Sequence, residues 1–385
     1  MNVVIVGGGF AGVKAALELS KRQVGRVTLI SDEEYFLHHA TLYATATGKS
    51  LAESVIPLKD IFENHPNVKV IHDKIASINP TRRLLTGAKK QYSYDKAIIA
   101  LGSVTTYFGI KGMAEHCYGI KSLEDIKKFQ NHIHEAVVHN KLDKDYVIIG
   151  AGPTGVELAG ALCQYLHSTI RLHRLSSAKT RVTLVEAAPR ILPRMSATAS
   201  KIVGKRLKKM GIRVLVDHKV EALDDDYILV DGKKIDTTTA IWTSGVANNP
   251  FFAAHADKFD LAPNGRVNVD QYLEAIPGVY VIGDNNMVKY SGTAWPAMAQ
   301  AEFVAKHLSR IATKRPVRAF RPRSFIGGVP VGEGWGYVEW LGVYASGRTG
   351  AFIRRWIELA GYQQFVSRRK ARELWRAHNI PEIDA

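Results

Sequence analysis

The chain has 385 residues, 46% of them hydrophobic and 23% charged, which is typical of a folded globular protein with two or three domains. Its 52 lysines and arginines outnumber its 36 aspartates and glutamates, and the net charge of +16 favours an anionic partner, such as a membrane surface, a nucleic acid or an anionic cofactor. The two cysteines, Cys117 and Cys163, are too few for a disulfide framework and argue against dithiol redox chemistry and a cysteine-ligated metal.

The N-terminal residues predict a dinucleotide-binding turn. An apolar run at 2–6 predicts a strand, and residues 13–19 predict a helix. Between them, Gly7, Gly9 and Gly12 have the GxGxxG spacing, in which the first glycine permits a tight turn, the second admits a pyrophosphate and the third lets the helix pack on the strand. The N–H groups at the helix start then face the phosphates. The alternative is a glycine-rich turn without a ligand.

The next segment contains the candidate ribose contact. An acidic residue is expected about 20 residues after the glycines, where it binds the adenosine ribose. Ser31 stands at that position and Asp32 follows, so either residue is a candidate. Residues 35–48 are apolar and rich in small side chains, and we expect a loop and a short helix near the ligand. We expect His38 and His39 to pack and hydrogen-bond rather than to bind a metal.

Three further segments complete the first unit. Residues 68–71 predict a strand, residues 75–86 predict a β-hairpin, and residues 94–103 predict a buried strand that ends in a glycine turn. Small residues at the end of this last strand, including Ala100 and Gly102, would let the chain pass close to a bound cofactor.

The strand–turn–helix unit then occurs a second time. Residues 145–149 predict a strand, Gly150, Gly152 and Gly155 repeat the glycine spacing, and residues 156–162 predict a helix. An internal repeat of this kind is a more specific signal than either copy alone.

The second unit continues as the first does. A strand at 181–185 ends at Glu186, and the polar, basic segment 167–179 before it predicts an extended helix and a loop. Strands at 212–216 and 239–245 complete the unit, and the second of them echoes the small residues that end the corresponding strand of the first unit.

The C-terminal part begins with an apolar strand at 278–284 that ends in Gly283 and Asp284, followed by an alanine-rich helix. The composition changes from residue 314 onward, with a basic stretch and then an aromatic, glycine-rich stretch at 325–345. The chain starts directly with a strand and has no apolar run long enough to cross a bilayer, so we expect neither a signal peptide nor a transmembrane helix.

Residues 352–360 predict an amphipathic helix. Its polar face carries Arg354, Arg355 and Glu358. We expect this helix to lie in a membrane interface, with Phe352 and Trp356 at the acyl boundary and arginines on anionic headgroups. The alternative is a helix that packs on the first unit or on a second subunit.

The paired glycine motifs, the two strand-end glycine turns and the late Gly-Asp pair together resemble the flavoproteins with two dinucleotide-binding domains, and within them the type II NADH dehydrogenases, which are single-chain NADH:quinone oxidoreductases. The resemblance covers nearly the whole chain. It implies an α/β fold with two Rossmann-like domains: an FAD-binding domain at 1–115 and 253–320 and an NADH-binding domain at 116–252. It also implies a membrane-association region at 321–385 and a possible homodimer.

The resemblance also implies the cofactor contacts. Those for FAD are Gly7, Gly9, Phe10, Ala11, Gly12, Ser31, Asp32, Ile75, Ala100, Gly102, Gly283, Asp284 and Ala299. Those for NADH are Gly150, Gly152, Thr154, Gly155, Glu186 and Gly245. A carboxylate at Glu186 would bind the ribose hydroxyls and repel a 2′-phosphate, which favours NADH over NADPH.

The implied catalytic residue is Glu157, facing the nicotinamide and the flavin as a proton or quinone relay. Gln300 is the implied quinone contact. The family often carries a second glutamine a few residues later, and Val304 stands in or near its place, which indicates a differently lined quinone pocket.

The implied function is hydride transfer from NADH to FAD and transfer of two electrons to a membrane quinone, by a peripheral enzyme on the cytoplasmic face that pumps no protons. A sulfide:quinone reductase would need redox cysteines near the flavin. A soluble NADH-dependent reductase of a ferredoxin-like or other acceptor stays open, as does a nucleic-acid-binding flavoprotein of the apoptosis-inducing-factor type. The aromatic, amphipathic tail favours a membrane over nucleic acid.

Overall fold

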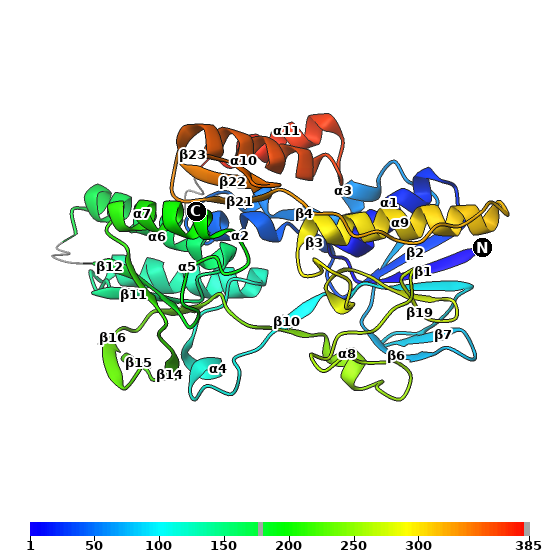
Figure 1. Cartoon of the computed structure of the whole chain (residues 1–385), viewed down its shortest axis with the longest axis horizontal. Helices are drawn as coiled ribbons and strands as arrows, with labels where there is room; N and C mark the ends of the chain where they lie inside the picture. Colours follow the sequence, from blue (N-terminus) through cyan, green and yellow to red (C-terminus); the bar gives the residue numbers. More distant parts are fainter. Residues whose placement is uncertain (176–179, 381–385) are drawn as a thin grey trace.

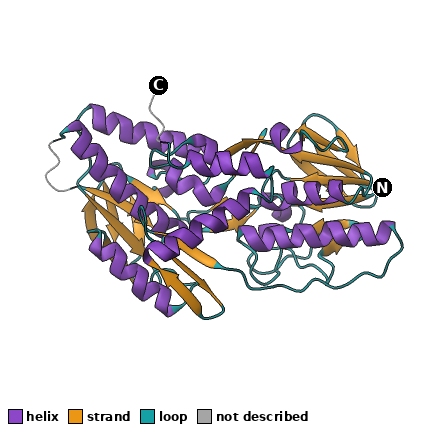
Figure 2. Cartoon of the chain, turned by 90° about the horizontal axis from the view of Figure 1, so that it is seen from above, coloured by secondary structure: helices purple, strands orange, loops and turns teal. Residues whose placement is uncertain are grey.

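The computed structural model describes residues 1–175 and 180–380, which form two α/β units with a C-terminal lobe lying across both (Figure 1). The C-terminal lobe comprises residues 327–380. Seen from above, the strands of the two units lie at opposite ends of the molecule (Figure 2). The loop expected within 167–179 lies partly outside the described residues.

The first unit is built on a six-stranded sheet with the order β19-β20-β9-β1-β2-β5. Its strands are parallel except for β19 at the edge. The bounds are β1 Asn2–Val6, β2 Arg26–Ser31, β5 Val68–His72, β9 Lys96–Ile99, β19 Glu274–Ile276 and β20 Val279–Val281.

Residues 3–6 of β1 are all apolar and buried, as expected for a strand with both faces of its sheet covered. Val3 and Ile5 face a core shared with the helices α1 (Phe10–Lys21) and α9 (Ala294–Ala312). Val4 and Val6 face the opposite core. That core is closed by a small antiparallel sheet of β6 (Ile75–Asn79), β7 (Leu84–Gly87) and β8 (Gln91–Ser93).

The second unit repeats this design on the parallel sheet β13-β12-β11-β17. Tyr146 and Ile148 of β11 face one core, and Val147 and Ile149 face the other. The strands are β11 Asp145–Ile149, β12 Arg181–Glu186, β13 Arg213–Val216 and β17 Ala240–Trp242. The first core includes residues of the helices α5 (Leu123–Val138), α6 (Pro153–His173) and α7 (Ala197–Lys209). The second core includes residues of β14 (Val220–Leu223) and β15 (Tyr227–Val230). Strand β15 also pairs with β16 (Lys233–Asp236).

The two units are joined by a short antiparallel pair, β10 (Ser103–Thr105) with β18 (Val246–Asn248). Gly102 and Gly245 come directly before these strands, each with a φ of +68°. The remaining short strands and α-helices described in the two units are β3 Tyr35–Leu37, β4 Val55–Pro57, α2 Leu42–Thr45, α3 Leu58–Phe62, α4 Met113–His116 and α8 Pro250–Ala253. The strand–turn–helix unit and its repeat are therefore both confirmed, and residues 35–48 contain a short strand besides the expected helix.

The C-terminal lobe consists of three antiparallel strands and two helices. They are β21 Gly327–Pro330, β22 Gly336–Trp340, β23 Val343–Ser346, α10 Gly347–Tyr362 and α11 Arg368–Ala377. Val329 and Tyr337 of its sheet join the core of the second unit, whereas Tyr362 and Leu374 of its helices join the core of the first. The lobe thus packs on both units at once. None of the described helices combines the length and the apolar composition of a membrane span.

The amphipathic helix predicted over 352–360 is present within α10, but the expected direction of its polar face is wrong. Arg354 and Glu358 are buried, with 9% and 5% of their surface exposed, and Phe352 and Trp356 are 64% and 54% exposed. The physical reason is that the two charged side chains find buried partners, so the helix turns its polar face inward. Arg354 is therefore not free to bind a lipid headgroup.

Candidate active site

The first glycine turn leaves no room for side chains at two of its positions. Gly7 has a φ of +111°, and a Cβ there would lie 2.2 Å from the Ala100 carbonyl oxygen. A Cβ on Gly12 would lie 1.9 Å from the Gly7 carbonyl oxygen. At Gly9, by contrast, no described atom lies within 4 Å of the Cβ position. The turn therefore fits a dinucleotide pyrophosphate, which needs an open approach at the middle glycine.

The second glycine turn has the same geometry. Gly150 has a φ of +102°, a Cβ on Gly155 would lie 1.8 Å from the Gly150 carbonyl oxygen, and the space at Gly152 is free of described atoms within 4 Å. Thr154 is exposed at the start of α6. Within the described chain, no side chain caps α1 or α6, so the first N–H groups of both helices are available to an anion.

The ends of β2 and β12 occupy equivalent places beside the two turns. The Glu186 carboxylate, at the end of β12, accepts hydrogen bonds from the backbone N–H groups of Ala151 (2.7 Å) and Ala188 (2.8 Å). At the end of β2, Ser31 is buried and its Oγ accepts a hydrogen bond from the Glu33 N–H, whereas Asp32 is exposed. Among the residues that the structure describes, the second unit thus holds a carboxylate against its glycine turn, and the first unit has the buried Ser31 at the equivalent place.

The ends of β9 and β20 bring another group of predicted residues to the first turn. Gly283 has a φ of +77°, and a Cβ there would lie 3.2 Å from the Cβ of Ala11. Next to it, Asp284 Oδ2 accepts a hydrogen bond from Ser103 Oγ at 3.0 Å, and Ser103 Oγ accepts one from Lys121 Nζ at 3.1 Å. Burial lowers the pKa of Lys121 to about 8, although Asp284 opposes this shift.

Asn285 connects the segments at this edge of the sheet through its side-chain hydrogen bonds. Its carboxamide accepts a hydrogen bond from the Gly102 N–H and donates to the Gly102 carbonyl oxygen and to Asn248 Oδ1. The sequence interpretation missed Asn285 and Lys121, because neither belongs to a motif. The position of Asn285 directly after the Gly-Asp pair was the available signal.

Gln300 on α9 is fully buried, and its side chain is hydrogen-bonded to the loop that contains Gly283 and Asn286. Its Oε1 accepts hydrogen bonds from the Gly283 N–H and Asn286 Nδ2, both at 2.8 Å, and its Nε2 donates to Ser291 Oγ at 3.0 Å. Contact with a quinone would require some of these bonds to break. Val304, one turn further along α9, is fully buried in the core of the first unit.

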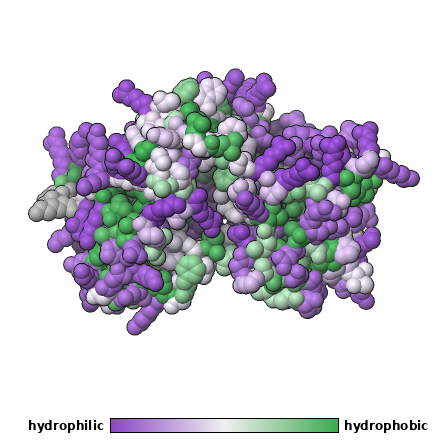
Figure 3. Space-filling view, viewed as in Figure 1, coloured by the Kyte–Doolittle hydropathy of each residue, from purple (hydrophilic) through white to green (hydrophobic). Residues whose placement is uncertain are grey.

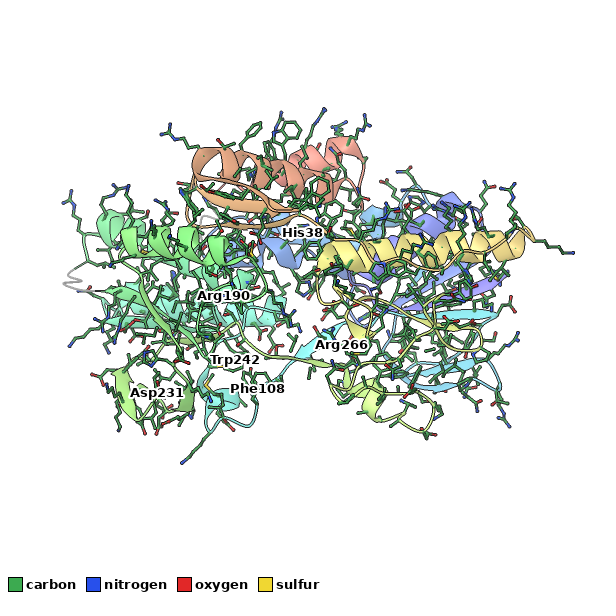
Figure 4. The ribbon with its side chains drawn as sticks, viewed as in Figure 1. His38, Phe108, Arg190, Asp231, Trp242 and Arg266 are labelled. Atoms are coloured by element: carbon green, nitrogen blue, oxygen red, sulfur yellow. The ribbon has the colours of Figure 1, made fainter. Side chains whose placement is uncertain are left out.

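The other predicted cofactor residues lie in different settings. Phe10 begins α1 and packs edge-on against Phe36, with ring centroids 4.9 Å apart, and Ala299 is exposed on α9. Ile75 is buried in the core between the first sheet and its hairpin. A Cβ on Gly245 would lie 2.6 Å from the ring of Phe108, which also contacts Trp242 (Figure 4).

Glu157 on α6 is buried against the C-terminal lobe. Its Oε1 lies 4.0 Å from Nη2 of Arg354 on α10, and Nη1 of Arg354 lies 3.7 Å from Glu358 Oε2. Burial raises the pKa of Glu157 to about 8, while the charge of Arg354 opposes the shift and that of Glu358 adds to it. A carboxyl group of this kind holds a proton at neutral pH and can release it to a base.

His38 and His39 pack and hydrogen-bond, as predicted. The His38 ring stacks on Tyr362 with centroids 4.5 Å apart, beneath the C-terminal lobe, and its Nδ1 lies 3.2 Å from Thr41 Oγ1 (Figure 4). Burial lowers the pKa of His38 to about 3, and the charge of Arg354 adds to this shift. The ring of His39 makes a hydrogen bond with the Leu37 carbonyl group.

The two cysteines lie in different cores on opposite faces of the second sheet. Cys163 is buried beside α7, and Cys117 packs with Tyr107 and Trp242. Burial raises the pKa of both thiols, that of Cys117 to about 12. They do not form a cysteine pair of the kind that sulfide oxidation would need.

Comparisons with known sequences identify the family of the chain. The family described as pyridine nucleotide-disulphide oxidoreductase matches residues 1–301. The type II NADH:quinone oxidoreductase Ndh of Mycobacterium tuberculosis is 31% identical over 330 residues, which cover 79% of this chain and 71% of that protein. The type II NADH:quinone oxidoreductase of Staphylococcus epidermidis is 26% identical over 382 residues, which cover 93% and 94% of the two chains.

Solved structures show the same fold. NDH2 from Plasmodium falciparum in complex with NADH superposes with a TM-score of 0.85 at 16% identity and covers 98% of this chain and 97% of that one. The sulfide:quinone oxidoreductase of Aquifex aeolicus superposes with a TM-score of 0.80 at 18% identity, with 96% and 92% coverage. The predicted fold class, with two dinucleotide-binding units, is thereby confirmed.

Proposed function

The chain belongs to the type II NADH:quinone oxidoreductases, within the pyridine nucleotide-disulphide oxidoreductase family, and we propose the following division of labour among its residues. The enzyme oxidises NADH and reduces a quinone through FAD, without proton pumping. The observation that carries this function is the pair of glycine turns with the same geometry in one chain, since each fits one dinucleotide.

FAD belongs to the first turn and to the edge of the sheet formed by Gly102, Gly283 and Asp284. When bound, FAD accepts a hydride and passes two electrons on. The chain's part is to hold this cofactor through backbone N–H groups at the start of α1 and through the side chains of Asp284 and Lys121. Residues 1–115 and 253–320 form the domain that holds FAD, and residues 116–252 form the one that holds NADH.

NADH belongs to the second turn, because Glu186 stands there. Its carboxylate is held by two backbone N–H groups and can accept the hydrogen bonds of ribose hydroxyls. A 2′-phosphate would place negative charge next to it, so the site favours NADH over NADPH.

Glu157 is the proton donor to the quinone. Reduction of a quinone by two electrons leaves negative charge on its oxygens, and a proton must reach them. The Glu157 carboxyl is protonated at neutral pH and buried between the second unit and the C-terminal lobe, so it can deliver that proton away from bulk water.

The C-terminal lobe is the surface for membrane association. Large apolar side chains are exposed on its strands and on α10, and Figure 3 shows hydrophobic side chains over this lobe. They are Trp340, Leu341, Val343, Tyr344, Phe352 and Trp356. We name these six residues the apolar patch. Aromatic residues of this kind prefer the interface of a bilayer. A homodimer stays a prediction.

The function is tested by separating its two half-reactions. Purified protein loaded with FAD is mixed anaerobically with NADH, and the flavin absorbance is followed. We expect the flavin to bleach and then to recover when a short-chain quinone is added. Bleaching without rapid recovery would leave a different acceptor as the physiological oxidant.

A further inference from the structure

A buried cluster of ionisable groups begins near the end of the chain. His378 follows α11 and has 18% of its side chain exposed, and its Nδ1 lies 2.8 Å from Glu53 Oε2. Glu53 is fully buried, and within the described chain its Oε1 has no hydrogen-bond partner. One donor atom each of Glu53, Glu358 and His378 lie within 4.8 Å of one another.

The inner end of the cluster reaches Glu157. Glu358 contacts Nη1 of Arg355 at 2.8 Å and Nη1 of Arg354 at 3.7 Å, and the same Arg354 guanidinium lies 4.0 Å from Glu157. Tyr43 on α2 is buried, which raises the pKa of its hydroxyl, and the charges of Glu358 and Glu157 add to this shift. A set of buried ionisable groups, with neighbouring polar atoms 2.8 to 4.8 Å apart, thus lies between a partly exposed histidine and the proposed proton donor.

The charges of this cluster do not balance unless a proton is retained. Its described acidic groups are the carboxyls of Glu53, Glu157 and Glu358, and its permanent cations are the guanidiniums of Arg354 and Arg355. Arginine does not release its proton at physiological pH. One carboxyl must therefore be protonated, or His378 must be charged, because an uncompensated buried charge is strongly unfavourable. The extra proton is shared by groups that can exchange it.

We propose that His378, Glu53 and Glu358 form a proton inlet that reloads Glu157 from solvent, an inference that rests on the proposed function. NADH, a quinone and one solvent proton give NAD⁺ and the quinol, whose other proton is delivered with the hydride of NADH. His378 takes up the solvent proton and passes its Nδ1 proton to Glu53. From there the proton moves to Glu358 and then past the Arg354 guanidinium to Glu157. No electron moves along this path.

The groups that face the inlet come from every element packed around it. They are Tyr43 on α2, Glu53 before β4, Glu157 on α6, Arg354, Arg355, Glu358 and Tyr362 on α10, His378 after α11, and His38 beneath α10. Of these, Tyr362 donates its hydroxyl proton to the Glu53 carbonyl oxygen at 2.6 Å, which fixes the backbone of Glu53.

The test compares the half-reactions of His378→Ala with those of the wild-type holoenzyme. Flavin reduction by NADH needs no solvent proton and should keep its rate. Flavin reoxidation by quinone should slow by roughly 10-fold or more, and added imidazole should restore much of the rate. The exposed His139 provides a matched control, and His139→Ala should change neither rate. Glu53→Gln should slow the same half-reaction, with no rescue by imidazole.

Three outcomes would contradict the proposed proton inlet. The first is an unchanged quinone half-reaction in both His378→Ala and Glu53→Gln while the wild type reduces quinone. The second is a loss in His378→Ala that imidazole does not restore. The third is a stoichiometric divalent metal that a chelator removes from the purified wild type, which would make the cluster a metal site. A wild type that reduces no quinone contradicts the proposed function instead. In that case, infrared difference spectra of the wild type and of His378→Ala still test the inlet, because the change in protonation of Glu157 should depend on His378.

Discussion

Arg354 on α10 lies 4.0 Å from the carboxyl oxygen Oε1 of Glu157 on α6, although the two residues are far apart in the sequence. The C-terminal lobe therefore completes the surroundings of the proposed proton donor. The same helix presents Phe352 and Trp356 to the exterior. The proposed attachment to a membrane and the surroundings of Glu157 thus involve the same helix.

Replacing Glu157 by Gln should change the pH dependence of stability. Burial raises the pKa of this carboxyl from 4.5 to about 8, so between these values the folded chain holds a proton that the unfolded chain has released. Stability then falls as the pH rises through this window, and below it the two states bind equal numbers of protons. Glu157→Gln removes the effect and should be more stable than the wild type by about 1–3 kcal/mol at about pH 8, but not at about pH 4. Urea unfolding at both pH values measures this, and an equal difference at both would contradict it.

Replacing Arg354 by Met should shift the pH dependence of quinone turnover. The rate should fall in the alkaline range as Glu157 loses its proton. The positive charge of Arg354 holds the pKa of Glu157 down, so its removal should move this alkaline limb to higher pH. Arg354→Lys keeps the charge and serves as the control. The measurement is a pH–rate profile for the wild type and each variant. Identical alkaline limbs in all three proteins would show that Arg354 does not influence the titration that limits turnover.

Two alanine substitutions in the first glycine turn should separate folding from cofactor binding. A Cβ on Gly12 would collide with the Gly7 carbonyl oxygen, so Gly12→Ala should lower stability. A Cβ on Gly9 meets no described atom within 4 Å but enters the space of a pyrophosphate, so Gly9→Ala should fold and lose FAD. Thermal unfolding of the apoprotein and the flavin content after reconstitution check both. Full FAD content in Gly9→Ala would move the pyrophosphate away from this turn.

Replacing Glu186 by Gln should weaken the preference for NADH. The neutral side chain keeps one hydrogen-bond acceptor and no longer repels a 2′-phosphate, so the ratio of kcat/KM for NADH to that for NADPH should fall by roughly 10-fold or more. An unchanged ratio would show that the ribose lies elsewhere.

Serine substitutions at Phe352 and Trp356 should release the protein from vesicles. The two rings are exposed and lie 6.0 Å apart between centroids, so the double variant removes a large apolar area without disturbing the core. Binding to vesicles that contain anionic lipid should fall by roughly 10-fold in a sedimentation assay. Leu172→Ser is the matched control, because Leu172 is an exposed apolar residue at the far end of α6. Equal binding by both variants would mean that the apolar patch has another purpose.

The sequence predicted the parts of the fold that depend on neighbouring residues. The crowding at Gly12 and the open space at Gly9 follow from backbone geometry within one turn, and the same geometry recurs at Gly155 and Gly152. Glu186 was identifiable because it ends the strand that follows the second turn. These signals are local, and no distant partner can change them.

The parts that could not be predicted depend on distant partners. The pattern of α10 gives two faces but not which face is buried, and the buried carboxylates near Arg354 reversed the expected direction. Gln300 was expected at the quinone from a motif, and its actual hydrogen bonds go to a loop whose path only the fold reveals. Lys121 lies beside Asp284 because the junction between the units brings them together.

The stoichiometry of the reaction shows whether the enzyme passes electrons from NADH to a quinone. The FAD-loaded protein is supplied anaerobically with limiting NADH and excess short-chain quinone, and both NAD⁺ and quinol are measured. We expect one quinol for each NADH oxidised and a rate that far exceeds the rate with NADPH. NADH oxidation that yields no quinol, and proceeds only when oxygen or a protein acceptor is added, would contradict the proposed function.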